Sequence, residues 1–166
     1  MAAVPIVESA KVFMITGSAT SPDLVNKSKF FARDYPHDGT QGKVLAEAAN
    51  KKGWKKIAVI QEKTDYALGV VNAFSNKFTE LGGIIVKEEF TTETTDMRSV
   101  LTKLKSSKPD ALLISAQTTA SGGRILKQMQ ELKWKPSLMV NDVIGTDPKS
   151  VEENKVALEG AVFADF

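Results

Sequence analysis

Lys55-Lys56-Ile57-Ala58-Val59-Ile60 is the clearest sign of how this chain folds. Its apolar, β-branched residues are typical of a strand that is covered on both faces of a parallel sheet. Similar runs recur at intervals of 24 to 27 residues, and they begin near Ile57, Ile84, Ala111, Ser137 and Ala161. An amphipathic helical pattern fills each interval, which predicts successive right-handed βαβ units. We therefore expect an α/β fold with three layers, a parallel sheet with helices on both faces.

The helical patterns have recognisable ends. The first covers residues 40–52 and stops at Gly53, and the second covers residues 65–81, with Asp65 as its cap. Further helices are predicted to begin after Asp96, at Thr119 or Ser121, and at Asp147-Pro148. The inner faces of the first two helices are predicted to hold Val44, Leu45, Ala48 and Ala49, and Val70, Phe74, Phe78 and Leu81.

The composition of each run predicts its place in the sheet. Residues 56–60 and 111–116 are almost entirely apolar, so we expect them at the centre. Residues 84–90 include Lys87-Glu88-Glu89, which is typical of an edge strand or an exposed strand end. Trp54 and Trp134 each precede a strand, and we interpret both as packing residues.

Residues 1–39 do not share this regular pattern. They contain a helical fragment at 4–10, a short apolar strand at 12–15, and a possible second strand at 30–33. Between the two strands lies a loop rich in small residues and hydroxyls, Thr16-Gly17-Ser18-Ala19-Thr20-Ser21-Pro22-Asp23-Leu24, which we call the hydroxyl loop. Because it follows a strand, its chemistry suits a compact polar group, especially a carboxylate. A boundary is expected near residues 34–40.

Composition excludes several classes of protein. The chain has 166 residues, enough for one α/β domain, and a net charge of +2 without a dense basic patch, so nucleic acid is not an expected partner. There is no cysteine, which excludes disulfides and thiolate metal sites. No apolar run approaches the ~20 residues of a membrane helix, and residues 1–5 lack the features of a signal peptide.

Motifs for catalysis are also missing. No glycine-rich nucleotide fingerprint follows a strand. His37 is the only histidine, which rules out a zinc pair, and no G-x-S-x-G motif surrounds Ser18 or Ser115, so we interpret His37 as a surface loop residue. A phosphoacceptor domain would need clustered acids, and Glu62 has no evident acidic partner. We therefore expect no enzyme, no metal and no cofactor.

Ligands of open α/β sheets bind beyond the carboxyl ends of the strands. Two residues stand out there. Tyr66 is either a phenol that points over a cleft or a half-buried surface aromatic. Asp142 is either an acid for a ligand ammonium in a low-dielectric cleft or a turn aspartate. The segments that this rule selects are residues 61–66, 91–96, 117–121 and 141–145, with the hydroxyl loop if it faces the same edge.

Several stretches carry a family resemblance in their order and spacing. They are Gly17-Ser18-Ala19-Thr20-Ser21-Pro22-Asp23-Leu24; Phe31-Ala32-Arg33 with Asp38-Gly39-Thr40-Gln41-Gly42; Lys55-Lys56-Ile57-Ala58-Val59-Ile60 leading to Asp65-Tyr66; Thr95-Asp96-Met97 with Leu101-Thr102-Lys103-Leu104; and Lys108-Pro109-Asp110-Ala111. Together they resemble the type I periplasmic binding proteins of the branched-chain amino-acid ABC transporter class, the leucine/isoleucine/valine-binding proteins. The resemblance covers essentially the whole chain.

The resemblance implies two α/β lobes, joined by three crossings, that close over a ligand. Ser18, Ala19 and Thr20 would hold the ligand α-carboxylate from the first lobe. Tyr66 would stack over the ligand from the second lobe, and Asp142 would receive the α-ammonium.

Two departures from the family pattern concern the ligand. Gln117 or Thr118 stands where an aromatic is common, and Asp142 replaces a longer glutamate. Both departures argue against a purely aliphatic amino acid.

The resemblance also implies a longer protein. The opening strands of the first lobe and the return into it after Phe166 are missing, so we expect a fragment, with residues 1–33 from the first lobe and 34–166 as the second. The strand at 12–15 would lack its sheet. We expect it to augment the second-lobe sheet or to exchange between two chains of a homodimer.

The function implied is an extracytoplasmic solute-binding protein of an ABC importer, periplasmic or extracellular. It would bind an amino acid or a related aromatic or aliphatic carboxylate and present it to a membrane permease. The alternative is a ligand-sensing domain of a receptor or regulator with the same fold.

Overall fold

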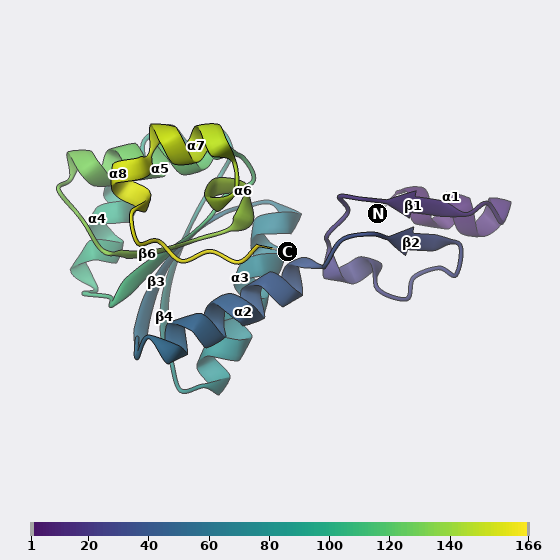
Figure 1. The fold of residues 1–166 in the computed structure, drawn as a ribbon, viewed down its shortest axis with the longest axis horizontal. Coiled ribbons are helices and arrows are strands. Elements are labelled where there is room, and N and C mark those ends of the chain that lie inside the picture. The colour runs from purple at the N-terminus through teal and green to yellow at the C-terminus, as the bar shows by residue number, and fades with distance from the viewer. Residues whose placement is uncertain (1, 166) are drawn as a thin grey trace.

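The computed structural model describes residues 2–165 and shows a larger body with a smaller N-terminal projection (Figure 1). The projection contains α1, β1 and β2, η1 lies against α2 and α3, and the body begins with α2. The elements are α1 (Ala3–Ala10), β1 (Met14–Thr16), η1 (Pro22–Leu24, a 3₁₀ turn), β2 (Phe31–Arg33), α2 (Asp38–Lys51), β3 (Lys56–Glu62), α3 (Asp65–Glu80), β4 (Ile84–Phe90), α4 (Arg98–Ser106), β5 (Ala111–Ser115), α5 (Thr119–Glu131), β6 (Ser137–Val140), α6 (Asp142–Gly145), α7 (Pro148–Glu153) and α8 (Lys155–Leu158).

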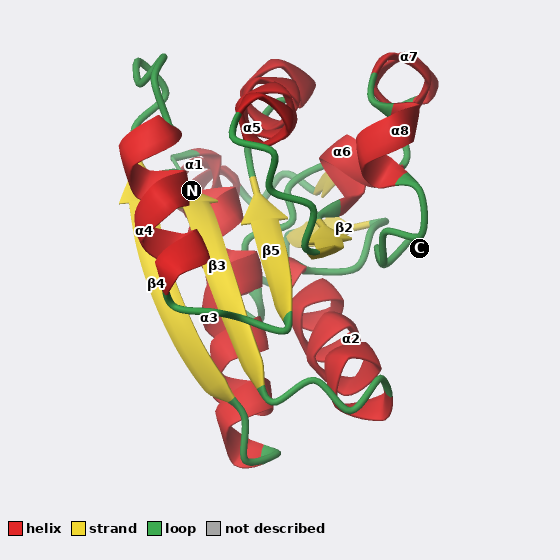
Figure 2. Ribbon diagram, turned by 90° about the vertical axis from the view of Figure 1, so that its left-hand side faces the viewer, coloured by secondary structure: helices red, strands yellow, loops and turns green. Residues whose placement is uncertain are grey.

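A parallel four-stranded sheet in the order β4-β3-β5-β6 forms the centre of the body. The carboxyl ends of its strands point the same way (Figure 2). β3 and β5 each have two neighbours, and every residue of β5 is buried. The central places predicted for these two strands and the edge place predicted for β4 are therefore confirmed.

Alternate residues of β3 face opposite layers of the core. Ile57 and Val59 pack in a cluster with residues of α2 and α3. Ala58 and Ile60 pack in a second cluster with residues of α4 and α5. This alternation is the period of two that a strand imposes on its side chains. It confirms the three-layer α/β architecture.

α2 and α3 cross at very short distance because position 42 is glycine. A Cβ atom on Gly42 would lie 2.3 Å from the Val70 carbonyl oxygen and 2.6 Å from the Phe74 nitrogen. The contact face of α2 is consequently centred on Gly42 and includes Leu45, Ala46 and Ala49. The prediction that Val44 faces inward is wrong, since its side chain is 46 % exposed.

One predicted helix cap is displaced by one residue, and of the two starts predicted for α5 the structure has Thr119. Thr64, not Asp65, caps α3, because the Thr64 hydroxyl accepts a hydrogen bond from the Ala67 backbone N–H. Thr118 caps α5 in the same way, through the Ser121 N–H, so α5 begins at Thr119. Asp147 caps α7 as predicted, and Pro148 takes the first helical position.

The strand predicted near Ala161 is reduced to a single bridge. Val162 lies against Met139 of β6; its N–H donates to Leu138 O and its carbonyl accepts from Val140 N–H. Gly160, with a φ of 73°, turns the chain toward the sheet only just before this point. A full strand therefore does not form within the described residues.

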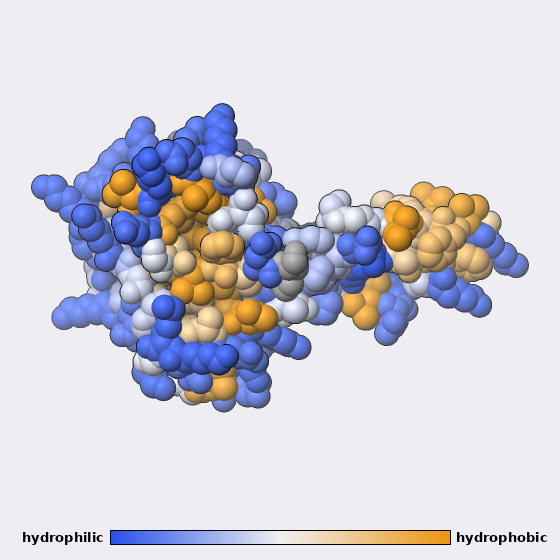
Figure 3. Space-filling view, viewed as in Figure 1, coloured by the Kyte–Doolittle hydropathy of each residue, from blue (hydrophilic) through white to orange (hydrophobic). Residues whose placement is uncertain are grey.

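The N-terminal strand pairs locally. β1 begins at Met14, two residues later than predicted, because Val12 N–H bonds to Val7 O at the end of α1. β1 is parallel to β2 in a separate two-stranded sheet. The prediction that it augments the larger sheet is wrong, since β2 supplies a nearer partner. Figure 3 shows apolar residues gathered on this projection, and Phe13 and Ile15 are both 64 % exposed.

None of the helices in residues 2–165 is both long and apolar enough to cross a membrane. Trp54 and Trp134 are half-buried against the two core clusters, which agrees with their interpretation as packing residues.

Candidate functional site

The hydroxyl loop is held in place by the segment that follows β2. The Arg33 guanidinium donates from one nitrogen to Ala19 O and to Ser21 O, both at 3.0 Å. The backbone N–H of Asp34 donates to Thr16 O at 2.9 Å, and that of Asp38 to Thr20 O at 3.0 Å. The loop therefore has a defined conformation although it lies outside regular structure.

Asp38 anchors the end of this segment from inside the protein. Its side chain is 3 % exposed, and one carboxylate oxygen has no hydrogen-bond partner in the described part of the chain. Burial raises the pKa of Asp38, the negative charge of Asp142 raises it further, and the Thr20 hydroxyl and Arg33 act in the opposite direction. Asp38 thus joins the hydroxyl loop to the first turn of α2.

A second polar cluster lies at the carboxyl ends of β3, β5 and β6. The Tyr66 hydroxyl, at the start of α3, donates to the Asp142 carboxylate. The amide nitrogen of Asn141 donates to the Tyr66 oxygen at 3.0 Å and to Ala116 O at 2.7 Å. The Val143 N–H donates at 2.9 Å to the same carboxylate oxygen that Tyr66 contacts. Asp142 is therefore a fixed acceptor at the start of α6.

Both tyrosines of the chain are coupled to this acid. Burial raises the pKa of Tyr66 well above its ordinary value, and the hydrogen bond and charge of Asp142 add to the effect. The pKa of Tyr35 is also raised, first by burial, then by the charges of Asp142 and Asp165, and by a side-chain hydrogen bond with Asp142. Both phenols consequently stay neutral donors near neutral pH.

The hydroxyl loop and the acid cluster border one concavity of about 380 Å³, which we call the strand-end site. Its lining residues follow five different strands, β1, β2, β3, β5 and β6, as expected for the ligand edge of an α/β sheet. They are Gly17, Ser18, Thr20, Tyr35, Tyr66, Gln117, Asp142 and Val143.

The structure brings five of the seven predicted ligand-binding residues to this site. They are Ser18, Thr20, Tyr66, Gln117 and Asp142. Ala19 is not among the lining residues, and its carbonyl accepts a hydrogen bond from Arg33. Thr118 is used as the cap of α5, and its hydroxyl donates to Ser121 Oγ at 3.1 Å.

Sequence reasoning gave no site role to Tyr35, Arg33 or Asp38, although Arg33 and Asp38 stand in the stretches that carry the family resemblance. All three lie in or beside the irregular segment that was interpreted as a domain boundary, where no periodic pattern exists. The only local signal was a tyrosine between an acid and a proline, Asp34-Tyr35-Pro36.

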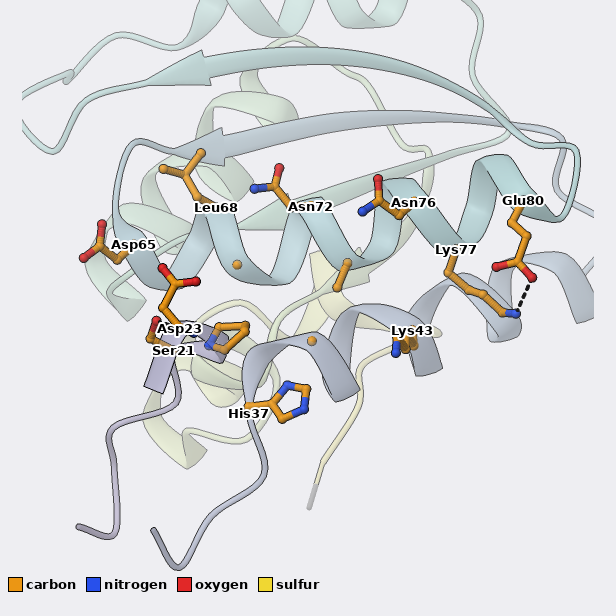
Figure 4. Close-up of a pocket in the computed structure, with 14 residues that line it drawn as sticks. Ser21, Asp23, His37, Lys43, Asp65, Leu68, Asn72, Asn76, Lys77 and Glu80 are labelled. Atoms are coloured by element: carbon orange, nitrogen blue, oxygen red, sulfur yellow. Dashed lines mark hydrogen bonds and ion pairs between the residues drawn. The ribbon is translucent and has the colours of Figure 1, made fainter. Parts of the chain in front are cut away.

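A larger concavity of about 670 Å³ lies elsewhere, between α2, α3 and η1 (Figure 4). It holds mixed charges, and Lys77 pairs with Glu80 at its edge at 3.2 Å. His37 borders it directly before α2, half-buried, and within residues 2–165 its Nδ1 has no hydrogen-bond partner. No group of acidic or histidine side chains in the described residues is arranged as a metal site.

Comparison with known proteins gives a consistent match. The model of the family described as "Receptor family ligand binding region" matches residues 1–162. Leu/Ile/Val-binding protein homolog 3 of Brucella melitensis is 32 % identical over 125 residues, which are 72 % of this chain and 33 % of the relative.

Solved structures share the fold. A leucine binding protein from Thermotoga maritima superimposes with a TM-score of 0.83 at 32 % identity, covering 93 % of this chain and 44 % of that protein. A solute binding protein of an ABC transporter from R. palustris, in complex with 4-hydroxybenzoate, has a TM-score of 0.81 at 22 % identity, covering 92 % of this chain and 44 % of that protein. The chain thus spans about a third of the curated relative and less than half of either structure.

Proposed function

Because the chain belongs to the Leu/Ile/Val-binding family of type I periplasmic binding proteins, we propose that it forms part of the solute-binding protein of an ABC importer. Members of this family bind ligands and are not enzymes. The observation that carries the proposal is the strand-end site, where the hydroxyls of the loop face the same concavity as Asp142 and its two phenols. The hydroxyl loop and the cluster around Asp142 therefore offer complementary groups to one small solute.

The hydroxyl side is suited to a carboxylate. Ser18 and Thr20 line the concavity and contribute hydroxyl donors, and we expect backbone N–H groups of the loop, that of Ala19 included, to add to them when a ligand binds. The acid side is suited to an ammonium, because the Asp142 carboxylate is an acceptor and no lysine or arginine of residues 2–165 lines the concavity. Gln117 supplies an amide between the two, with Thr118 directly beside it. We assign residues 1–33 to the first lobe and residues 34–166 to the second.

The ligand class that we propose is an amino acid or a related small carboxylate. The named relatives support this range, since one is a leucine binding protein and another was solved with 4-hydroxybenzoate. In the intact protein, closure of both lobes over the solute would create the surface presented to a membrane permease. The location that follows is the periplasm or the extracellular side of the membrane.

Titration of the isotopically labelled chain with amino acids and aromatic acids, followed by NMR and calorimetry, tests the proposal. We expect dissociation constants in the millimolar range, because the chain spans less than half of the solved relatives and supplies a corresponding part of the contacts. Chemical-shift changes should centre on Ser18, Thr20, Tyr66 and Asp142. Nanomolar binding, or changes confined to the concavity between α2 and α3, would contradict it.

A ligand-sensing domain of a receptor or regulator is a second candidate. The family description, which names receptor ligand binding regions, favours it. Both candidates use the same site, so ligand binding does not separate them. The gene sequence on either side of this region does: a signal peptide and neighbouring permease genes indicate import, whereas a membrane helix or a DNA-binding motif indicates sensing.

We also propose that the exposed face of β1 pairs with a second copy of the chain in isolation. Val12, Phe13 and Ile15 are more than half exposed, and β1 is an edge strand of a two-stranded sheet. Size-exclusion chromatography with light scattering should give a dimer that Phe13→Lys dissociates. A monomeric wild-type chain at about 100 μM would show that this face stays unpaired.

A further inference from the structure

The regular hydrogen bonding of β5 ends just before the strand-end site begins. The last residue of β5 that is paired with β3 is Ser115, and the last one paired with β6 is Ile114. The chain continues through Ala116, which is buried, to Gln117, which is exposed and lines the site. The peptide group that joins Ala116 to Gln117 therefore lies just beyond the paired part of the sheet.

Side chains from both neighbouring strands bind this peptide group. Its N–H, on Gln117, donates to the Glu62 carboxyl at 2.8 Å, and its carbonyl, on Ala116, accepts from the Asn141 amide at 2.7 Å. Glu62 is the last residue of β3, and Asn141 directly follows β6. The two side chains thus take the place of the strand neighbours that would bind this peptide group if the sheet continued. We call this arrangement the peptide clamp.

The peptide clamp consists of polar side chains in places where the core would favour apolar ones. Glu62 and Asn141 are both 0 % exposed, and one oxygen of each, Oε1 and Oδ1, has no hydrogen-bond partner among residues 2–165. The neighbouring Lys63 pairs with Glu89. Burial of polar atoms without partners costs free energy, and apolar side chains of similar size would avoid that cost. Stability alone thus does not explain the residue types at positions 62 and 141.

The peptide clamp connects two residues of the strand-end site that come from different elements. A peptide group is planar, so hydrogen bonds to its N–H and to its carbonyl restrict the orientation of the whole unit and the direction of the Gln117 side chain. Asn141 also donates to the Tyr66 hydroxyl oxygen, at 3.0 Å. Gln117, after β5, and Tyr66, after β3, are consequently held relative to each other through one buried amide.

We infer that Glu62 and Asn141 are positioning residues of the strand-end site, which act on a bound solute through Gln117 and Tyr66 without lining the concavity themselves. This inference rests on the proposed function, since it needs a solute at the site. Loss of the acceptor at position 62 frees the Gln117 backbone and weakens solute binding. The effect depends on the acceptor oxygen, so an amide at position 62 can replace the carboxyl group.

Hydrogen exchange of the full chain without ligand tests the contact itself. Relative to their intrinsic rates, the Gln117 amide should exchange about tenfold more slowly than that of Thr118, because only the first has an acceptor within residues 2–165. Glu62→Leu removes the acceptor and should make the two rates similar. Glu62→Gln retains an amide oxygen that can accept and should keep the difference. Equal rates in wild type would overturn the peptide clamp.

Solute affinity tests the positioning role. The probes are leucine and 4-hydroxybenzoate, and NMR gives the dissociation constant of each probe that binds. We expect Glu62→Leu to weaken binding by roughly threefold to tenfold, the value of one hydrogen bond, and Glu62→Gln to restore most of the affinity.

Gln128→Leu is the matched control for these variants. Gln128 is also buried, and it also binds the backbone on two sides, through Met97 N–H at 2.6 Å and Thr95 O at 2.7 Å. It does not line the strand-end site, so its variant should bind the probes as wild type does. A loss of affinity equal to that of Glu62→Leu would show a general effect of buried polar groups and would overturn the positioning role.

A second variant tests the other half of the peptide clamp. Asn141→Asp keeps the size of the side chain and removes both N–H donors, so it should weaken binding at least as much as Glu62→Leu. It also replaces Glu62→Leu in the test if that variant does not fold.

The outcomes separate the two proposals. If Glu62→Leu frees the Gln117 amide and leaves the affinity for the probes unchanged, the positioning role is wrong and the solute-binding function stands. If neither probe binds wild type at tens of millimolar, the proposed function fails and the positioning role fails with it. The exchange rates of wild type show in either case whether the peptide clamp exists.

Discussion

The four-stranded sheet and the two-stranded sheet of this chain differ in how much apolar surface they cover. In the larger sheet, Ile60 and Leu113 are fully buried between helices on both faces. Around the smaller sheet, Val4 and Val7 of the neighbouring helix α1 are buried. Ile6, Phe13 and Ile15 remain about two-thirds exposed. Burial stabilises by about 25 cal/mol for each Å² of apolar surface. The body thus contains the interactions that keep it folded, whereas the projection stays largely without apolar contacts.

Truncating one phenylalanine in each region tests this difference most strongly. Phe74 is fully buried and stacks on Phe78 with ring centres 5.3 Å apart. We expect Phe74→Ala to lower the free energy of unfolding by ~3–5 kcal/mol, because a cavity remains in the core. At concentrations where the chain is monomeric, Phe13→Ala should change it by less than about 0.5 kcal/mol, as surface substitutions do. Urea unfolding of both variants measures the two values, and similar losses would show that the projection is part of the cooperative core.

The close crossing of α2 and α3 gives the next largest effect. Gly42→Ala places a methyl group against the α3 backbone, which cannot move as a flexible side chain can. We expect a loss of ~1–3 kcal/mol, typical of overpacking. Gly123→Ala in α5 is the matched control, because its nearest neighbour would be Asn154 Nδ2 at an ordinary 3.6 Å. Thermal unfolding should show a lower melting temperature for the first variant and no loss for the second.

Alkaline pH tests how the strand-end site is coupled to the body. The unfolded chain loses the Tyr66 proton near pH 10, while the folded protein, with its raised pKa, retains it. The unfolded state then binds fewer protons, so the free energy of unfolding falls as the pH rises above about 10. In Tyr66→Phe the free energy of unfolding should fall less steeply than in wild type, by about 1 kcal/mol per pH unit. Equal slopes for both proteins between pH 9 and 11 would contradict the buried phenol.

The smallest effect on global stability is expected from Arg33, which orders the hydroxyl loop without entering either core cluster. Arg33→Met should increase hydrogen exchange of the Asp34 and Asp38 amides, which donate to loop carbonyls, by about tenfold. The free energy of unfolding should change by less than about 0.5 kcal/mol. Unchanged exchange would show that the loop is held by its backbone alone.

The sheet was predictable because burial on both faces leaves a strong pattern. β3 and β5 each contain a continuous apolar run, Ile57–Ile60 and Ala111–Ile114, and the regular spacing of such runs predicted the order of strands and helices. The inner face of α2 was not predictable in the same way. Val44 is as apolar as Leu45, and only the contact of Gly42 with the α3 backbone determines how the helix is rotated.

The strand-end site was predictable where it depends on the strand-end rule. Tyr66 and Asp142 are 76 residues apart in sequence, yet they form a hydrogen bond because each follows a strand of the same parallel sheet. Tyr35 follows the short β2, which had only a weak pattern, and its contact with Asp142 is created by long-range folding. Asp38 was missed for the same reason, since nothing local indicates that this acid becomes buried.

The lining residues of the strand-end site follow the strands of the two sheets, whereas most core residues stand within strands and helices. Ligand binding and stability thus depend mainly on different residues of the chain. New specificities can evolve by changing these residues one at a time, while the buried residues of the sheet stay the same. A designer who wants a sensor for another small metabolite could keep the sheet unchanged and diversify only positions 18, 20, 35, 66, 117 and 142.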